Sequence, residues 1–211
     1  MTTIYSESTS VFQPPTLVVL DFVNTLSSRG SDQPGDQLKH YNDLITWSIQ
    51  KGLIALDKAH RLIDQANQDP EKGVQTLLRA ILLREAIYHI IEAAKGNNPP
   101  KQGDLDTLNR ELAVAANYYK LTFQLDHFEW EWECPTDNLE QILWPIAQAA
   151  ADLLDSAFLR RVGICEDETC RWLFYDTSKN HSRRWCDMDD CGNRAKARRH
   201  YARKKVITDQ N

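Results

Sequence analysis

Residues 165–194 read CEDETCRWLFYDTSKNHSRRWCDMDDCGNR, and four cysteines in this stretch decide how the end of the chain folds. Cys165 and Cys170 form one pair, Cys186 and Cys191 form another, and four residues lie inside each pair. Two such knuckles, each donating two thiolates, meet the needs of a tetrahedral structural zinc ion. The stretch is too short to bury a core of its own, so metal binding would supply folding free energy on the order of 10 kcal/mol. We therefore predict one structural zinc ion held by these four cysteines.

A catalytic zinc site is the alternative, and it needs an open coordination position and usually a histidine or carboxylate ligand. His181 and His200 lie near the cysteines in sequence, but four thiolates already complete the coordination sphere. The rest of the chain contains no glycine-rich phosphate loop, nucleophile elbow or pair of catalytic carboxylates. We predict that the protein is not an enzyme. The rival hypothesis is an enzyme that acts on a small molecule through its N-terminal part and uses zinc only structurally.

The composition is that of an ordinary globular protein, with 42% hydrophobic and 26% charged residues among 211. We recognise no signal peptide and no apolar run that approaches a membrane span. These observations predict a cytoplasmic protein without a membrane partner. In that reducing compartment clustered cysteines bind metal more often than they form disulfides.

Charge is distributed unevenly along the chain. The formal net charge is -5, yet residues 192–205 hold seven basic residues and no acidic one. A basic end on an acidic body indicates a polyanionic partner, such as nucleic acid, for that end. Two other readings stay open: the basic end docks on the acidic body of the same chain, or on an acidic protein partner.

Most of the chain has the three- and four-residue periodicity of amphipathic helices. We predict helices over residues 36–52, 54–67, 71–95 and from 104 onward, and a last one over 138–160 with a kink at Pro145. Residues 17–20 are either a short strand or the lead-in to a helix capped by Asp21.

Between the helices, residues 121–132 alternate in period two, which predicts a β-hairpin whose apolar face lies on the helices. The predicted fold is mainly α with a small antiparallel β-hairpin and a C-terminal treble-clef-like zinc module. We place a helical domain at residues 1–160 and the zinc module at 161–211.

Two polar residues, Asp21 and Asn24, interrupt an apolar stretch near the start of the chain. They are candidates for binding a small-molecule effector, and the alternative is that they are caps or satisfied polar residues of the core. A body without visible chemistry joined to a reader module suggests a sensor or dimerisation domain, so a homodimer is possible.

The basic segment after Cys191 predicts a helix that Asn193 caps and that runs to about residue 205. Such a helix fits the major groove of DNA, where arginine reaches guanine edges or phosphates. The candidate nucleic-acid contacts are Arg183, Arg184, Arg194, Lys196, Arg198, Arg199 and Arg203. An alternative role for Arg194 is to neutralise the thiolates. The acidic residues inside both cysteine pairs should face away from DNA, because phosphates would repel them.

The motif from Cys165 to Arg199, and above all Cys191-Gly-Asn-Arg194, resembles the CGNR zinc finger. Upstream, Leu20-Asp-Phe-Val-Asn-Thr-Leu26 and Tyr41-Asn-Asp-Leu-Ile-Thr-Trp47 resemble the ABATE domain that accompanies it. The resemblance implies a bacterial stress-induced transcription regulator whose finger binds DNA, which would place the protein at the nucleoid. One rival is an RNA-binding module in which Trp172, Trp185 and Tyr201 stack on bases.

Overall fold

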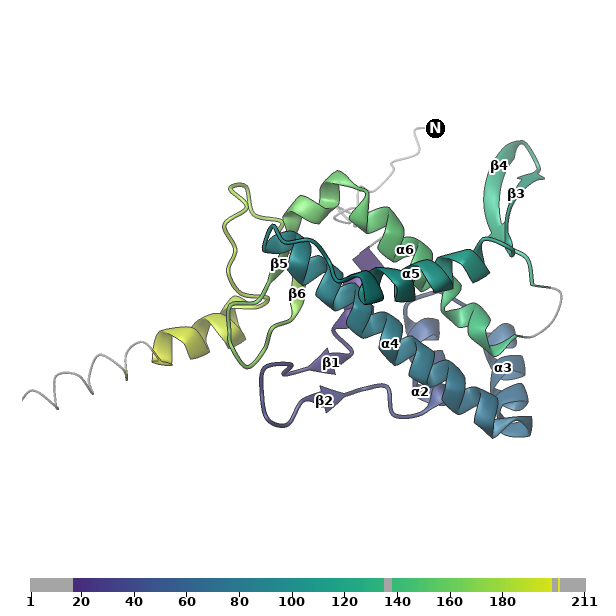
Figure 1. The fold of residues 1–211 in the computed structure, drawn as a ribbon, viewed down its shortest axis with the longest axis horizontal. Coiled ribbons are helices and arrows are strands. Elements are labelled where there is room, and N and C mark those ends of the chain that lie inside the picture. Colours follow the sequence, from purple (N-terminus) through teal and green to yellow (C-terminus); the bar gives the residue numbers. More distant parts are fainter. Residues whose placement is uncertain (1–16, 135–137, 199–200, 202–211) are drawn as a thin grey trace, which may run out of the picture.

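The computed structural model describes residues 17–134, 138–198 and 201, and it confirms the mainly α-helical class (Figure 1). The described helices are α1 (Val18–Val23), α2 (Tyr41–Gln50), α3 (Leu56–Gln68), α4 (Pro70–Lys95), α5 (Gln102–Ala115) and α6 (Trp144–Leu154). Three pairs of short antiparallel strands accompany them. Arg199, Arg203 and the rest of the predicted basic helix beyond residue 198, apart from Tyr201, lie outside the described residues.

Helix α4 is the central element of the body, and it contacts α1, α2, α3, α5 and α6 (Figure 1). Its start has the expected chemistry: the Asp69 side chain accepts a hydrogen bond from the Lys72 amide, and Pro70 occupies the first turn. Along its inner face Ala80, Leu83 and Ile87 are completely buried. The predicted helix over residues 71–95 is therefore confirmed.

The region before α2 differs from the prediction. Residues 17–20 are not a strand, and Asp21 lies inside α1 instead of capping a helix. The helix extends to both sides of Asp21 because it buries apolar residues before it, Val19 and Leu20, and after it, Phe22 and Val23. Residue Asp36 does not start a helix either. It belongs to β2 (Gly35–Asp36), which pairs with β1 (Leu26–Ser27).

The predicted kinked helix over residues 138–160 is also wrong. A short 3-10 turn (Leu139–Ile142) comes first, and Pro145 then stands at the start of α6, where the missing amide hydrogen costs nothing. After α6, a second 3-10 turn (Ala157–Arg161) leads into the C-terminal module.

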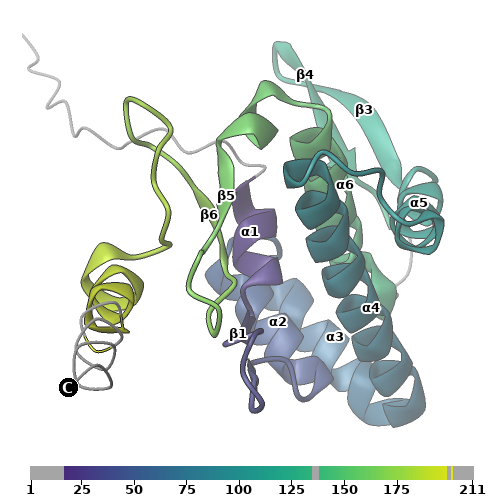
Figure 2. The ribbon, with the colours of Figure 1, turned by 60° about the vertical axis from the view of Figure 1, so that its left-hand side comes forward.

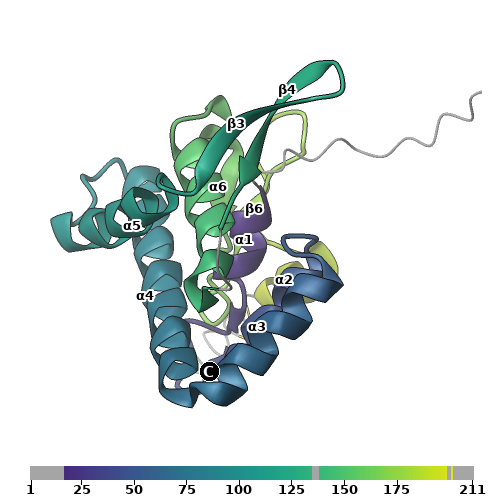
Figure 3. The same ribbon diagram turned by 90° about the vertical axis from the view of Figure 1, so that its right-hand side faces the viewer.

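The predicted hairpin is present as β3 (Tyr119–Gln124) and β4 (His127–Trp132). Its apolar face, however, packs on the body only at the base, where Tyr119 stacks on Trp132 and Trp132 contacts Trp144. Figure 3 shows the reason: the hairpin projects beyond the ends of the helices. The prediction that the whole face lies on the helices is wrong.

The C-terminal module starts with β5 (Val162–Ile164), which pairs with β6 (Leu173–Tyr175). A long loop follows β6, then a turn of π-helix (Met188–Gly192) and a helix over residues 193–198. Strand β6 lies against α1, whereas the last helix lies at the edge of the molecule (Figure 2). This is the zinc-finger-like module that the sequence predicts.

Candidate metal centre

The four predicted ligands come together at one point of the module. The sulfur atoms of Cys165, Cys170, Cys186 and Cys191 all lie within 4.8 Å of one another. The Sγ of Cys186 is 3.6 Å from the Sγ of Cys170 and 3.6 Å from that of Cys191. Zinc–sulfur bonds of about 2.3 Å in a tetrahedron require sulfur atoms a little under 4 Å apart, so this donor set fits one zinc ion.

The thiols of this cluster influence one another's protonation, and this matters because zinc binds the deprotonated thiolates. The pKa of Cys170 is lowered to about 5, mainly because Cys186 donates a hydrogen bond to its sulfur. The pKa of Cys186 is raised by that same hydrogen bond and by burial, and the pKa of Cys191 is raised to about 12, chiefly by burial. Because zinc binds thiolates, its positive charge offsets the burial that favours the protonated forms of Cys186 and Cys191.

The acidic residue inside the first knuckle has a role that the sequence did not reveal. Asp167 is completely buried, and its carboxylate accepts hydrogen bonds from Thr169, from Arg198 at 2.6 Å and from Arg194 at 3.2 Å. Burial raises the pKa of Asp167, but these hydrogen bonds outweigh it and hold the pKa well below its usual range. The carboxylate thus fastens the helix over residues 193–198 to the knuckle.

Most of the predicted nucleic-acid contacts are engaged within the module. Arg194 also donates hydrogen bonds to Asp190 and to the sulfur of Cys191. Its position therefore fits the alternative role, which is to neutralise the charge of the zinc thiolates. Arg183 donates to the carbonyl groups of Trp185 and Cys186, so it shapes the loop before the second knuckle. Arg184 pairs with Glu166. Glu166 and Asp167 of the first knuckle therefore bind arginines of the same module.

Lys196 is placed differently. Arg194 and Arg198 stand four residues apart on one face of their helix, and both point to Asp167. Lys196 stands two residues from each, on the opposite side of the helix, where it is exposed.

A loop of the N-terminal body presses directly on the first knuckle. The amide of Arg29 donates to the carbonyl of Cys170 at 3.3 Å, and the amide of Gly30 donates to that of Thr169 at 3.2 Å. A Cβ atom on Gly30 would lie 1.7 Å from the carbonyl oxygen of Glu168, so only glycine fits this contact. No sequence pattern pointed to this contact, because its partners stand far apart in the chain.

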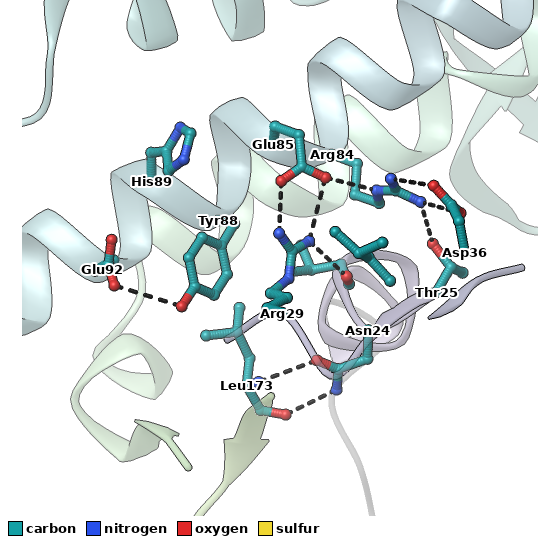
Figure 4. A network of polar contacts seen from close by, with 12 residues as sticks. Asn24, Thr25, Arg29, Asp36, Arg84, Glu85, Tyr88, His89, Glu92 and Leu173 are labelled. Atoms are coloured by element: carbon teal, nitrogen blue, oxygen red, sulfur yellow. Dashed lines mark hydrogen bonds and ion pairs between the residues drawn. The ribbon is translucent and has the colours of Figure 1, made fainter. Parts of the chain in front are cut away.

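A second contact joins α1 to β6. The side chain of Asn24 donates to the Leu173 carbonyl at 2.8 Å and accepts from the Leu173 amide at 3.0 Å (Figure 4). The indole of Trp172 donates to the carbonyl of Leu26 nearby. Asn24 is therefore a satisfied polar residue that clamps the two parts together, which was the alternative to its ligand-binding role.

Behind this contact lies a network of buried and partly buried charges (Figure 4). The guanidinium group of Arg29 pairs with Glu85 at 2.5 Å and lies over the ring of Tyr88. Arg84, with only 2% of its side chain exposed, pairs with Glu85 and with both carboxylate oxygens of Asp36 at 2.7 Å. The loop that touches the knuckle is thereby anchored to α4.

Asp21 lies at a different kind of place. It forms an exposed ion pair with Lys51 at 2.7 Å, and both residues line a cavity of about 620 Å³ between α1 and the zinc module. Arg183 and Cys186 lie on the module side of this cavity. The structure thus brings Asp21 and Asn24 to one cavity wall, although both Asn24 side-chain groups already have partners.

The tryptophans of the module point inward. Trp172 and Trp185 are partly buried and pack against the cysteine cluster. They are poorly placed to stack on RNA bases, which weakens the RNA-binding alternative. Tyr201 is exposed.

Together these features define a two-part protein in which a helical domain holds a four-cysteine zinc finger. Residues 17–157 match the ABATE family, described as "Putative stress-induced transcription regulator", and residues 161–204 match the CGNR zinc finger. The first match covers more than half of the chain, so the chain belongs to the ABATE family. No curated protein matches it. Among the described residues, no helix is both long and apolar enough to cross a lipid bilayer.

Proposed function

We propose that this protein is a non-enzymatic, DNA-binding transcription regulator whose zinc module presents a basic segment to the duplex. The observation that carries the proposal is the placement of that segment. Its helix starts directly after the last zinc ligand, is fixed by Asp167, and lies at the edge of the molecule (Figure 2). Zinc acts in this account as a clamp that orients the segment.

The arginines divide into two groups under this proposal. Arg194 and Arg198 position the helix, because both pair with the buried carboxylate of Asp167. DNA contact then falls to Lys196 and to Arg199 and Arg203, whose positions lie outside the described residues. The family description supports a regulatory role.

The two groups are separable by experiment. Changing Lys196, Arg199 and Arg203 together to Ala should leave zinc content and thermal stability unchanged. The slope of log affinity for duplex DNA against log salt should fall by about 3, one for each lost phosphate contact. The matched control is Arg198→Ala, which should lower the stability of the module. Unchanged, salt-dependent DNA retention by the triple variant would refute the assignment.

We also propose that an effector modulates DNA binding from the cavity between α1 and the zinc module. Its volume of about 620 Å³ suits a small molecule, and its walls belong to both parts of the protein. The facing charges of Asp21 and Lys51 suit a ligand with polar groups. A thermal-shift screen of polar metabolites against the full chain tests this. A true effector should lose its stabilising effect in the Lys51→Ala variant, and a screen without any stabilising compound would count against the site.

A further inference from the structure

The outer part of the β3–β4 hairpin presents an apolar surface that the described residues leave largely uncovered. Leu121 is 53% exposed, Phe123 62%, Phe128 68% and Trp130 57%. The pairing register places Leu121 opposite Trp130 and Phe123 opposite Phe128, so all four side chains share one face. We call these four residues the hairpin face.

The opposite face of the hairpin is polar and forms its own partners. Lys120 pairs with Glu133, and Gln124 bonds Glu131 across the strands. Thr122 bonds the carbonyl of Glu129. This face needs no further partner, and its glutamates disfavour nucleic acid or an anionic membrane.

A two-stranded ribbon is only marginally stable on its own in water. The base of this ribbon is held by the stacking of Tyr119 on Trp132 and on Trp130, but Phe123 and Phe128 lie nearer the turn, past that support. Figures 1 and 3 show that the hairpin stands clear of the helices, so another surface can approach it without colliding with the body. Burying the hairpin face would therefore stabilise the hairpin, and the face is accessible to a partner.

The exposed area of the hairpin face favours a second copy of this chain as the partner. Large side chains that are more than half exposed offer about 100 Å² each or more, and the tip residue Leu125 is 97% exposed. Two such faces packed together would bury roughly 1,000 Å² in total, the lower limit for a specific interface. The hairpin face carries no charge, so packing it on an identical face buries no unpaired ion.

We infer that the hairpin face is the interface of a homodimer, in which the hairpins of two copies pack face to face about a two-fold axis. Such an interface is isologous and closes after two copies. The inference does not depend on DNA binding. If both hold, the dimer offers two basic segments to one duplex, as two-fold symmetric regulators do.

The test is sedimentation velocity of the zinc-loaded full chain over a range of concentrations. Wild type should show a concentration-dependent dimer. Phe123→Lys and, on the other strand, Phe128→Lys should each raise the dimer dissociation constant by at least about 100-fold, since each removes two buried rings and adds two charges per dimer. The matched control is Gln124→Lys, which adds the same charge beside Phe123 on the polar face and should dimerise like wild type. Circular dichroism and zinc content verify that each variant is folded.

Three results would overturn the inference. One is a wild-type protein that stays monomeric at every concentration. This holds also if the monomer binds neutral phosphatidylcholine vesicles through the hairpin, since the hairpin face would then contact lipid and not a second copy. Another is an unchanged dimer in both hairpin variants. The third is a dimer that survives these changes but is lost in Leu78→Lys, because Leu78 belongs to a separate exposed apolar stripe on α4.

Discussion

The contact between Gly30 and the first zinc knuckle leads to a sharp prediction for the variant Gly30→Ala. The new methyl group would lie 1.7 Å from the carbonyl oxygen of Glu168, and because this is a backbone atom it cannot swing aside as a flexible side chain could. The loop must retreat from the knuckle. The amide bonds from Arg29 to Cys170 and from Gly30 to Thr169 would then be lost or stretched.

The expected magnitude follows from these losses. Forcing a methyl group into a packed contact costs about 1–3 kcal/mol, and each of the two hydrogen bonds contributes about 1 kcal/mol. We expect the free energy of unfolding to fall by about 3–5 kcal/mol, which lowers the Tm of a chain of this size by roughly 6–20 °C. Because the loop supports the knuckle, zinc should also pass faster to a chelator.

The assay is thermal unfolding together with the rate of zinc transfer to a coloured chelator. Gly103→Ala is the matched control, because nothing lies within 4 Å of a Cβ atom at Gly103. That variant should stay within about 1 kcal/mol of wild type. A Gly30→Ala protein with the Tm and zinc-transfer rate of wild type would refute the reasoning that this loop holds the knuckle.

Three further predictions concern the same junction and the metal. Asn24→Asp keeps the acceptor for the Leu173 amide but sets a carboxylate against the Leu173 carbonyl. The free energy of unfolding in urea should therefore fall by about 1–3 kcal/mol. A value equal to that of wild type would show that this contact is unimportant. Burial raises the pKa of Asp36, but the hydrogen bonds from Arg84 outweigh burial, so the net pKa is lowered. The carboxylate therefore stabilises the fold above its unfolded pKa of about 4, and this stabilisation is lost as the pH falls through the lower pKa of the folded state. The stability difference between wild type and Asp36→Asn should therefore shrink from pH 7 towards pH 3, and a constant difference would contradict the ion pair's role. Removing zinc with a chelator should abolish the circular dichroism contribution of the module and leave that of α4, and metal analysis of the native protein should give one zinc per chain; a fully folded metal-free module would contradict the structural role of zinc.

The sequence predicted those features that local patterns determine. Equal cysteine spacing identified the zinc ligands, and the periodicity of residues 71–95 together with Asp69-Pro70 marked α4. Alternating residues predicted the hairpin. Each of these signals lies within one short segment, so no knowledge of the tertiary arrangement was required.

The features that the sequence did not reveal depend on contacts between distant segments. Gly30 looked like an ordinary loop glycine, and only its approach to Glu168 explains it. Asp167 looked like an exposed acid that DNA would repel, yet the fold buries it under Arg194 and Arg198. Pro145 looked like a kink because the end of the preceding turn could not be recognised from composition.

Selection of bound sequences from a random duplex pool tests whether zinc orients the basic segment for DNA recognition. The selection is run in parallel with zinc-loaded protein and with chelator-treated protein. Our account predicts that the zinc-loaded protein enriches one sequence motif and that the treated protein enriches none. Absence of enrichment with zinc-loaded protein, or the same motif with and without zinc, would contradict it.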